Sequence, residues 1–88
     1  MLRDPGTLRG VVTVRLFAQA RESAGTASVN LPGATVGDVL DEACHRFGET
    51  FTAVLSGSKV WLNGAPADRT TPVDDNDEVA VLPPVSGG

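Results

Sequence analysis

The sequence predicts an α+β domain in which one main helix packs on one face of a mixed sheet of four or five strands. Four short segments alternate apolar and polar side chains as strands do, and one segment has helical periodicity. At 88 residues the chain forms one domain that buries roughly 60–70% of its unfolded surface. Two strands precede the helix and two or three follow it. Because so short a chain has one main helix to cover one face of the sheet, we expect the other face to stay partly open.

The first two strands are predicted at Val11–Phe17 and Ala27–Leu31. In the first, Val12, Val14 and Leu16 share one phase, whereas Phe17 falls in the polar phase. The segment between the strands contains a connecting turn that ends at Gly25 and is longer than two residues. We therefore expect an antiparallel hairpin.

The main helix is predicted to start after Thr35, the N-cap, with Asp38 in the capping-box position. Gly48 is expected to end it in a left-handed conformation. A further helical turn is expected over residues 51–55. The apolar residues of one helical face are Val36, Val39, Leu40, Ala43 and Phe47.

The remaining strands are predicted at Lys59–Leu62 and Glu78–Leu82. Asn63-Gly64 is typical of a tight hairpin turn. A second turn is expected over the acidic residues 74–77, with Asn76 able to adopt a left-handed conformation.

Strand phase divides the side chains of these strands between the two faces of the sheet. If Val79 and Val81 face the helix, Leu82 faces outward, and the same rule directs Trp61 outward. Phe17, Trp61 and Leu82 then share the uncovered face, where grouped apolar side chains indicate a protein-binding patch. Partial covering of these side chains by loops or by the N-terminal arm is the alternative.

The composition limits the classes of function. A formal net charge of −4 and a pI near 4.6 argue against nucleic-acid binding and favour a basic protein partner. A single cysteine excludes an intrachain disulfide, and residues 1–10 lack the apolar core of a signal peptide, so we expect a cytoplasmic protein. No segment has the apolar length of a membrane span. Residues 1–10 are expected to form a flexible arm before a domain at 11–82.

No residue in the body of the chain is predicted to carry catalysis or bind a metal. Cys44 lies at the edge of the buried helical stripe, and His45 points about 100° away from it on a helix, so the two do not form a Cys-His pair. The acidic turn lacks the glycine and the distant glutamate of a calcium loop. Residues 33–37 lack a phosphate-binding motif.

The tail at 83–88 is the remaining candidate site. Pro83-Pro84 favours an extended polyproline conformation, so the six tail residues could project up to roughly 19 Å. Gly87 and Gly88 could enter a narrow tunnel and leave the terminal carboxylate accessible. A frayed end is the alternative interpretation.

Four segments together resemble the small subunit of molybdopterin synthase, a ubiquitin-like sulfur carrier. The resemblance extends from about Val11 to the end and is most specific in the last dozen residues. It implies a β-grasp fold. The segments are Leu16–Gly25, Asn63-Gly64, Asp77–Ala80 and Pro83–Gly88.

The resemblance also implies a mechanism in which this chain carries sulfur and binds no cofactor. An E1-like adenylyltransferase would use ATP to adenylylate Gly88, and a sulfur donor protein would convert it to a thiocarboxylate. The tail would then insert into the large synthase subunit and give sulfur to a cyclic pyranopterin precursor. The implied tail residues are Pro83, Pro84, Val85, Ser86 and Gly87, and the matched interface residues are Phe17, Leu82 and Arg21.

Two features depart from the family pattern: the arm before Val11 is long, and Asn76 occupies a turn position that is often glycine. A sulfur carrier for thiamine or cysteine synthesis remains an alternative. A ubiquitin-like modifier or binding module is another. An enzyme acting alone is the least favoured, because no acid-base or nucleophile constellation is present.

Overall fold

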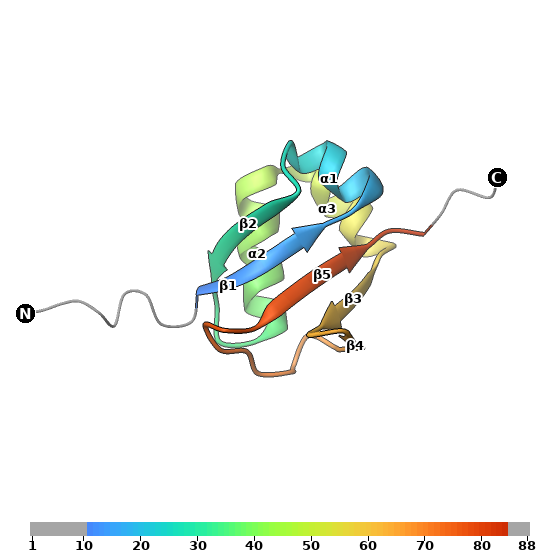
Figure 1. The fold of residues 1–88 in the computed structure, drawn as a ribbon. Coiled ribbons are helices and arrows are strands. Elements are labelled where there is room, and N and C mark those ends of the chain that lie inside the picture. The colour runs from blue at the N-terminus through green and yellow to red at the C-terminus, as the bar shows by residue number, and fades with distance from the viewer. Residues whose placement is uncertain (1–10, 85–88) are drawn as a thin grey trace, which may run out of the picture.

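The structure, a computed structural model, describes residues 11–84; the predicted arm at 1–10 and the tail residues 85–88 lie outside this range. The described chain forms one sheet in the strand order β2-β1-β5-β3-β4, and Figure 1 shows the helices gathered behind it. The predicted helix-on-sheet architecture is confirmed. Along the chain the elements are β1 (Val11–Leu16), α1 (Ala18–Ala24), β2 (Ser28–Pro32), α2 (Val36–Phe47), α3 (Glu49–Ser56), β3 (Lys59–Leu62), β4 (Ala65–Pro66) and β5 (Glu78–Leu82).

β1 and β2 form the predicted antiparallel hairpin, with Val12 opposite Leu31 and Val14 opposite Val29. The expectation of a simple connecting turn was wrong, because the connection contains the seven-residue helix α1. Ala20 is the buried residue of α1, so the segment has no apolar stripe that periodicity could detect. Gly25 ends it at φ +79° in the left-handed region, with its N–H bonded to the Arg21 carbonyl.

The cap of α2 agrees with the prediction at its first residue. The Thr35 hydroxyl accepts a hydrogen bond from the Asp38 N–H at 3.2 Å, and the Asp38 carboxylate accepts one from the Ala34 N–H at 3.3 Å. In a capping box the N-cap residue's own N–H donates to the side chain three residues later. Here the N–H of Ala34, the residue before the N-cap, donates to Asp38 instead.

The end of α2 differs from the prediction. Gly48 has a positive φ of 93°, as expected, but its ψ of −167° lies outside the left-handed helical region. The chain turns here directly into α3, whose eight residues exceed the single turn predicted. The ring of Phe51 on α3 packs against Phe47, with centroids 5.2 Å apart.

The loop after β4 closes over the start of α2. The Val36 N–H bonds to the Thr71 carbonyl and the Gly37 N–H to the Arg69 carbonyl, each at 2.9 Å. These amides belong to the first turn, which has no partners within the helix. They are therefore unavailable for phosphate.

Asn63 and Gly64 have positive φ values of 51° and 85° and form the predicted tight turn between β3 and β4. The acidic turn before β5 is attached to it, because the Asn63 amide donates to Asp77 and accepts from the Glu78 N–H, both at 2.9 Å. The left-handed conformation considered for Asn76 is not adopted, since the positive-φ residues other than glycine within 11–84 are Ala18 and Asn63.

The core lies between the inner face of the sheet and the helices. The residues predicted to point inward from β1, α2 and β5 are buried except Phe47 of α2, which is half-buried against the core, as are Val60 and Leu62. β5 runs parallel to β1 and antiparallel to β3, so it occupies the middle of the sheet. The buried core residues are Val12, Val14, Leu16, Ala20, Leu31, Val36, Val39, Leu40, Ala43, Phe51, Leu55, Val73, Val79 and Val81.

Candidate functional site

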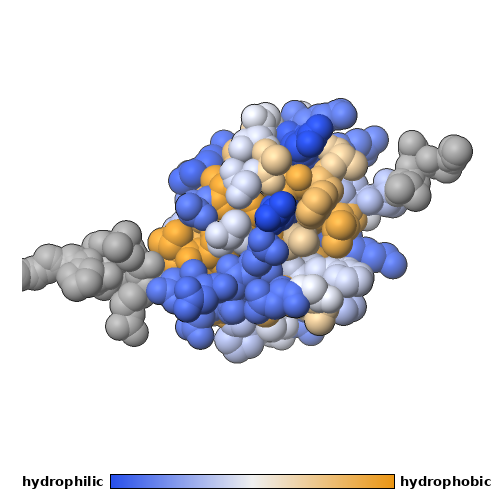
Figure 2. Space-filling model, viewed as in Figure 1, coloured by the Kyte–Doolittle hydropathy of each residue, from blue (hydrophilic) through white to orange (hydrophobic). Residues whose placement is uncertain are grey.

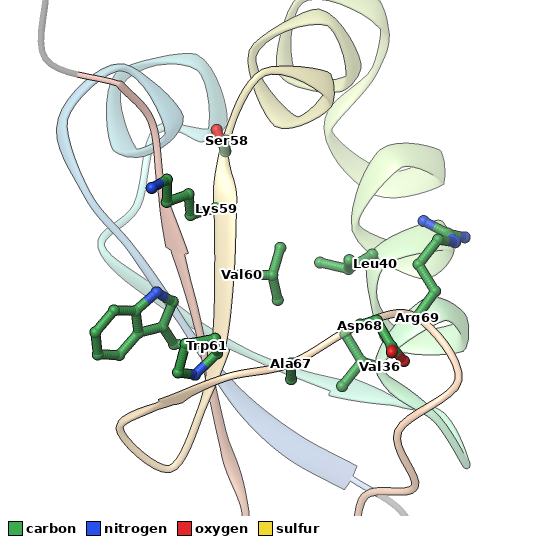
Figure 3. A pocket seen from close by; sticks show the side chains of 10 residues that line it. Val36, Leu40, Ser58, Lys59, Val60, Trp61, Ala67, Asp68 and Arg69 are labelled. Atoms are coloured by element: carbon green, nitrogen blue, oxygen red, sulfur yellow. The ribbon is translucent and has the colours of Figure 1, made fainter.

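The candidate site is the end of the open sheet face at which the chain leaves β5. Leu82 is the last residue of β5 and lies opposite Lys59 of β3, whereas Ala80 lies opposite Trp61. Because alternate residues of a strand point to opposite faces, these four side chains share the face away from the helices. Figure 3 agrees, since Lys59 and Trp61 point to the side of β3 opposite to Val60.

Phe17, the residue between β1 and α1, joins this group. The parallel register pairs Leu16 with Val81, and continuing it by one residue places Phe17 beside Leu82. Phe17 has extended backbone angles, caps α1, and keeps 41% of its surface exposed, the one large apolar side chain that is exposed among residues 11–84. The outward phase assigned to it from the sequence is confirmed.

Trp61 and Leu82 are half-buried rather than exposed. Their outward phase agrees with the register, and their side chains are less exposed than that of Phe17. We call Phe17, Trp61, Ala80 and Leu82 the outer apolar patch. Figure 2 views this side of the molecule, where hydrophobic and hydrophilic groups alternate across the surface.

Arg21 lies one helical turn after Phe17, and its N–H bonds to the Phe17 carbonyl at 3.3 Å. Its side chain is exposed, and the interface role that the resemblance implied for it stays a prediction. Lys59 was not identified as a site residue from the sequence. The phase that directs Trp61 outward directs Lys59 outward too, and this signal could have identified it.

The tail starts at the edge of the patch. Pro83 is half-buried and Pro84 exposed, and neither belongs to a helix or strand. The predicted tail residues Val85, Ser86, Gly87 and Gly88 lie outside the described residues. The structure therefore describes the base of the tail, Pro83 and Pro84, which follows Leu82 and lies near Phe17 and Lys59.

Other candidate groups have structural roles. Cys44 is half-buried against the core and His45 is exposed, as predicted. In the acidic turn, the side-chain bond from Asn63 and the backbone N–H of Asp74 hold the pKa of Asp77 below its usual range. Within residues 11–84, no cluster of His, Cys, Asp or Glu could hold a metal ion.

A groove lies between β3 and α2, under the loop after β4 (Figure 3). Its volume is about 420 Å³, and Leu40 and Val60 face each other across it. The Arg69 guanidinium at its rim is already bonded to the Gly37 carbonyl and the Asp41 carboxylate. Its neighbour Asp68 accepts bonds from Thr70 and Thr71, of which the bond from the Thr70 hydroxyl contributes most to lowering the Asp68 pKa. The polar groups at this rim therefore support the loop.

Comparison with known proteins identifies the class. Residues 14–88 match the model of the ThiS family, so the chain belongs to that family. The molybdopterin synthase sulfur carrier subunit of Aedes aegypti is 34% identical in an alignment 90 residues long, which covers 88% of each chain. The subunit of the same name from Arabidopsis thaliana is 35% identical over 80 residues, 88% of this chain and 82% of the relative.

Solved structures agree with the fold. The small archaeal modifier protein 1 of Methanosarcina acetivorans has a TM-score of 0.81 and 31% identity, covering 91% of this chain and 98% of that one. The chain is thus a β-grasp protein of the ubiquitin-like sulfur-carrier family. No helix within residues 11–84 is long and apolar enough to cross a membrane.

Proposed function

We propose that this chain is the sulfur carrier subunit of molybdopterin synthase. The observation that carries the proposal is the position of the tail base, which leaves the central strand beside the outer apolar patch. A partner that covers Phe17 and Leu82 is thereby placed to receive the tail. The two relatives named molybdopterin synthase sulfur carrier subunit, each about a third identical over most of the chain, support the assignment.

The chemistry takes place at the Gly88 carboxylate and requires partner proteins. A carboxylate is a poor electrophile, because its charge repels nucleophiles and oxide is a poor leaving group. An oxygen of the carboxylate attacks the α-phosphorus of ATP on the activating enzyme, and pyrophosphate leaves. Hydrosulfide delivered by a donor protein then attacks the acyl carbon and displaces AMP, and loss of the sulfur-bound proton leaves a thiocarboxylate.

The thiocarboxylate is a nucleophile that gives its sulfur to a cyclic pyranopterin precursor in the large subunit. Two donations form the dithiolene of molybdopterin. The carrier is consumed and recharged, and the acid, base and substrate contacts belong to the large subunit. The described part of this chain supplies the docking surface and the base of the tail.

Intact mass spectrometry tests the proposal. The purified chain is incubated with its activating enzyme, ATP and a sulfur donor, and we expect the mass increase of one oxygen-to-sulfur exchange, located at Gly88. Deletion of Gly88 should abolish this increase. Cys44→Ala is the matched control, because the one thiol of the chain could also accept sulfur, and this variant should still show the increase. No increase with an activating enzyme that charges another carrier would contradict the proposal.

The modifier alternative rests on the similarity to small archaeal modifier protein 1. It predicts that Gly88 becomes joined to lysines of other proteins, which denaturing gels would show as a ladder. A carrier for thiamine or cysteine synthesis would gain the same sulfur but would not support dithiolene formation when mixed with the large subunit.

A further inference from the structure

We propose that the partner surface that covers the outer apolar patch presents carboxylates opposite Lys59 and Arg21. This inference rests on the proposed function, because it concerns how the large subunit recognises the carrier. It also opposes the expectation of a basic partner drawn from the net charge of −4. The physical reason is that Lys59 and the acidic turn at residues 74–77 lie at opposite ends of β5.

Lys59 is the only lysine in the sequence. It is exposed, lies opposite Leu82 across β3 and β5, and points to the same side of β3 as Trp61 (Figure 3). A surface that covers Leu82 and Trp61 therefore also covers the stem of Lys59. Its ammonium group is then at the edge of the interface, at the base of the tail.

The other basic residue on the outer face is neutralised. Arg15 forms an ion pair with Glu78 at 3.3 Å, and within residues 11–84 the other ion pair joins Arg69 to Asp41. Arg21 is in neither pair and is exposed one helical turn after Phe17. Lys59 on the outer face and Arg21 on helix α1 are therefore two positive charges that form no ion pair within residues 11–84.

The acidic turn lies at the other end of β5. It immediately precedes Glu78, and Leu82 lies four positions after Glu78, which corresponds to about 13 Å along a strand. The Debye length at physiological salt is about 8 Å, so the turn is largely screened from Lys59. The Asp77 carboxylate is also engaged by the Asn63 side chain and the Asp74 N–H.

Covering the patch removes water from the surroundings of Lys59. An ammonium group that loses water without gaining an acceptor is unfavourable, and a carboxylate on the partner supplies both the acceptor and the opposite charge. Complementary charges at the rim of an interface mainly set the association rate and its dependence on salt. The partner surface is therefore expected to be apolar at its centre and acidic at its rim.

Charge reversal at Lys59 tests the inference. We expect Lys59→Glu to weaken binding to the large subunit of the same organism by about tenfold, and mainly through slower association. Lys59→Arg, which keeps the charge, should bind within about twofold of the unchanged chain. Asp75→Lys is the matched control, because it changes the net charge by the same size in the opposite direction at the acidic turn, and we expect an effect of less than about twofold.

The outcomes distinguish the inference from the function on which it rests. If the unchanged chain binds and Lys59→Glu binds equally well or more tightly, the partner surface is not acidic at this position and the inference is wrong. If Asp75→Lys changes binding as much as Lys59→Glu does, only net charge matters and the inference is again wrong. If the unchanged chain does not bind the large subunit, the proposed function fails and the inference fails with it.

Discussion

Replacing Phe17 with alanine separates docking from folding, because Phe17 keeps 41% of its surface exposed. Burying a whole phenylalanine stabilises a protein by about 1.5–3 kcal/mol, so the buried three-fifths, less the retained β-carbon, corresponds to roughly 1 kcal/mol. Truncation of an aromatic anchor in an interface costs about 2 kcal/mol or more. We therefore expect a small loss of stability and a roughly thirtyfold weaker complex with the large subunit.

Urea unfolding and titration calorimetry measure the two quantities. Phe51→Ala is the comparison, because Phe51 is fully buried and its truncation should cost about 3–5 kcal/mol, a large part of the roughly 4–13 kcal/mol expected for a chain of this size. If Phe17→Ala destabilised the chain as much as Phe51→Ala, the outward assignment of Phe17 would be refuted. Unchanged affinity of a folded Phe17→Ala variant would refute the docking role of the patch.

Two further predictions concern the fold. Gly33→Ala should lower the free energy of unfolding by about 1–3 kcal/mol, since an added β-carbon would lie 2.8 Å from the backbone nitrogen of Val39. Gly57→Ala is the control, because a β-carbon there would meet nothing within 4 Å, and it should change the free energy of unfolding little. Urea titration measures both variants. Asp77→Asn should make stability less dependent on acid, measured by thermal unfolding at several pH values. The pKa of Asp77 in the folded state is held below the usual 3.8, so the hydrogen bonds to its carboxylate stabilise the fold above pH 3.8. This stabilisation is lost as the pH falls through the folded-state pKa. If Asp77→Asn left the dependence of stability on pH unchanged, these hydrogen bonds would not contribute to it.

The strands and the main helix could be predicted because local pattern and tertiary burial agree there. Val12, Val14 and Leu16 alternate and are buried, and Thr35 binds the Asp38 N–H as its position indicated. Helix α1 could not be predicted from periodicity, because Ala20 is its one buried residue. The left-handed conformation expected of Gly48 and the one considered for Asn76 are not adopted, because neighbouring structure determines the backbone at both positions. Gly48 leads directly into α3, and the turn containing Asn76 is tied to Asn63 through Asp77.

The candidate site was predictable in part. Strand phase indicated that Phe17, Trp61 and Leu82 face outward, since side chains alternate in any strand. Phase does not reveal how far neighbouring residues cover a side chain, and Trp61 and Leu82 proved half-buried. The groove between β3 and α2 could not be predicted from the sequence, because the residues that line it are distant in the chain. Its apolar lining residues have the same sequence pattern as ordinary core residues.

By itself, the sequence determined the order of strands and main helix and the tight turn at Asn63-Gly64. These features depend on local periodicity and backbone preference. Only the tertiary structure decided that β5 lies between β1 and β3. That pairing joins residues far apart in the chain, so it alone brings Phe17 and Lys59 to the base of the tail and separates Lys59 from the acidic turn.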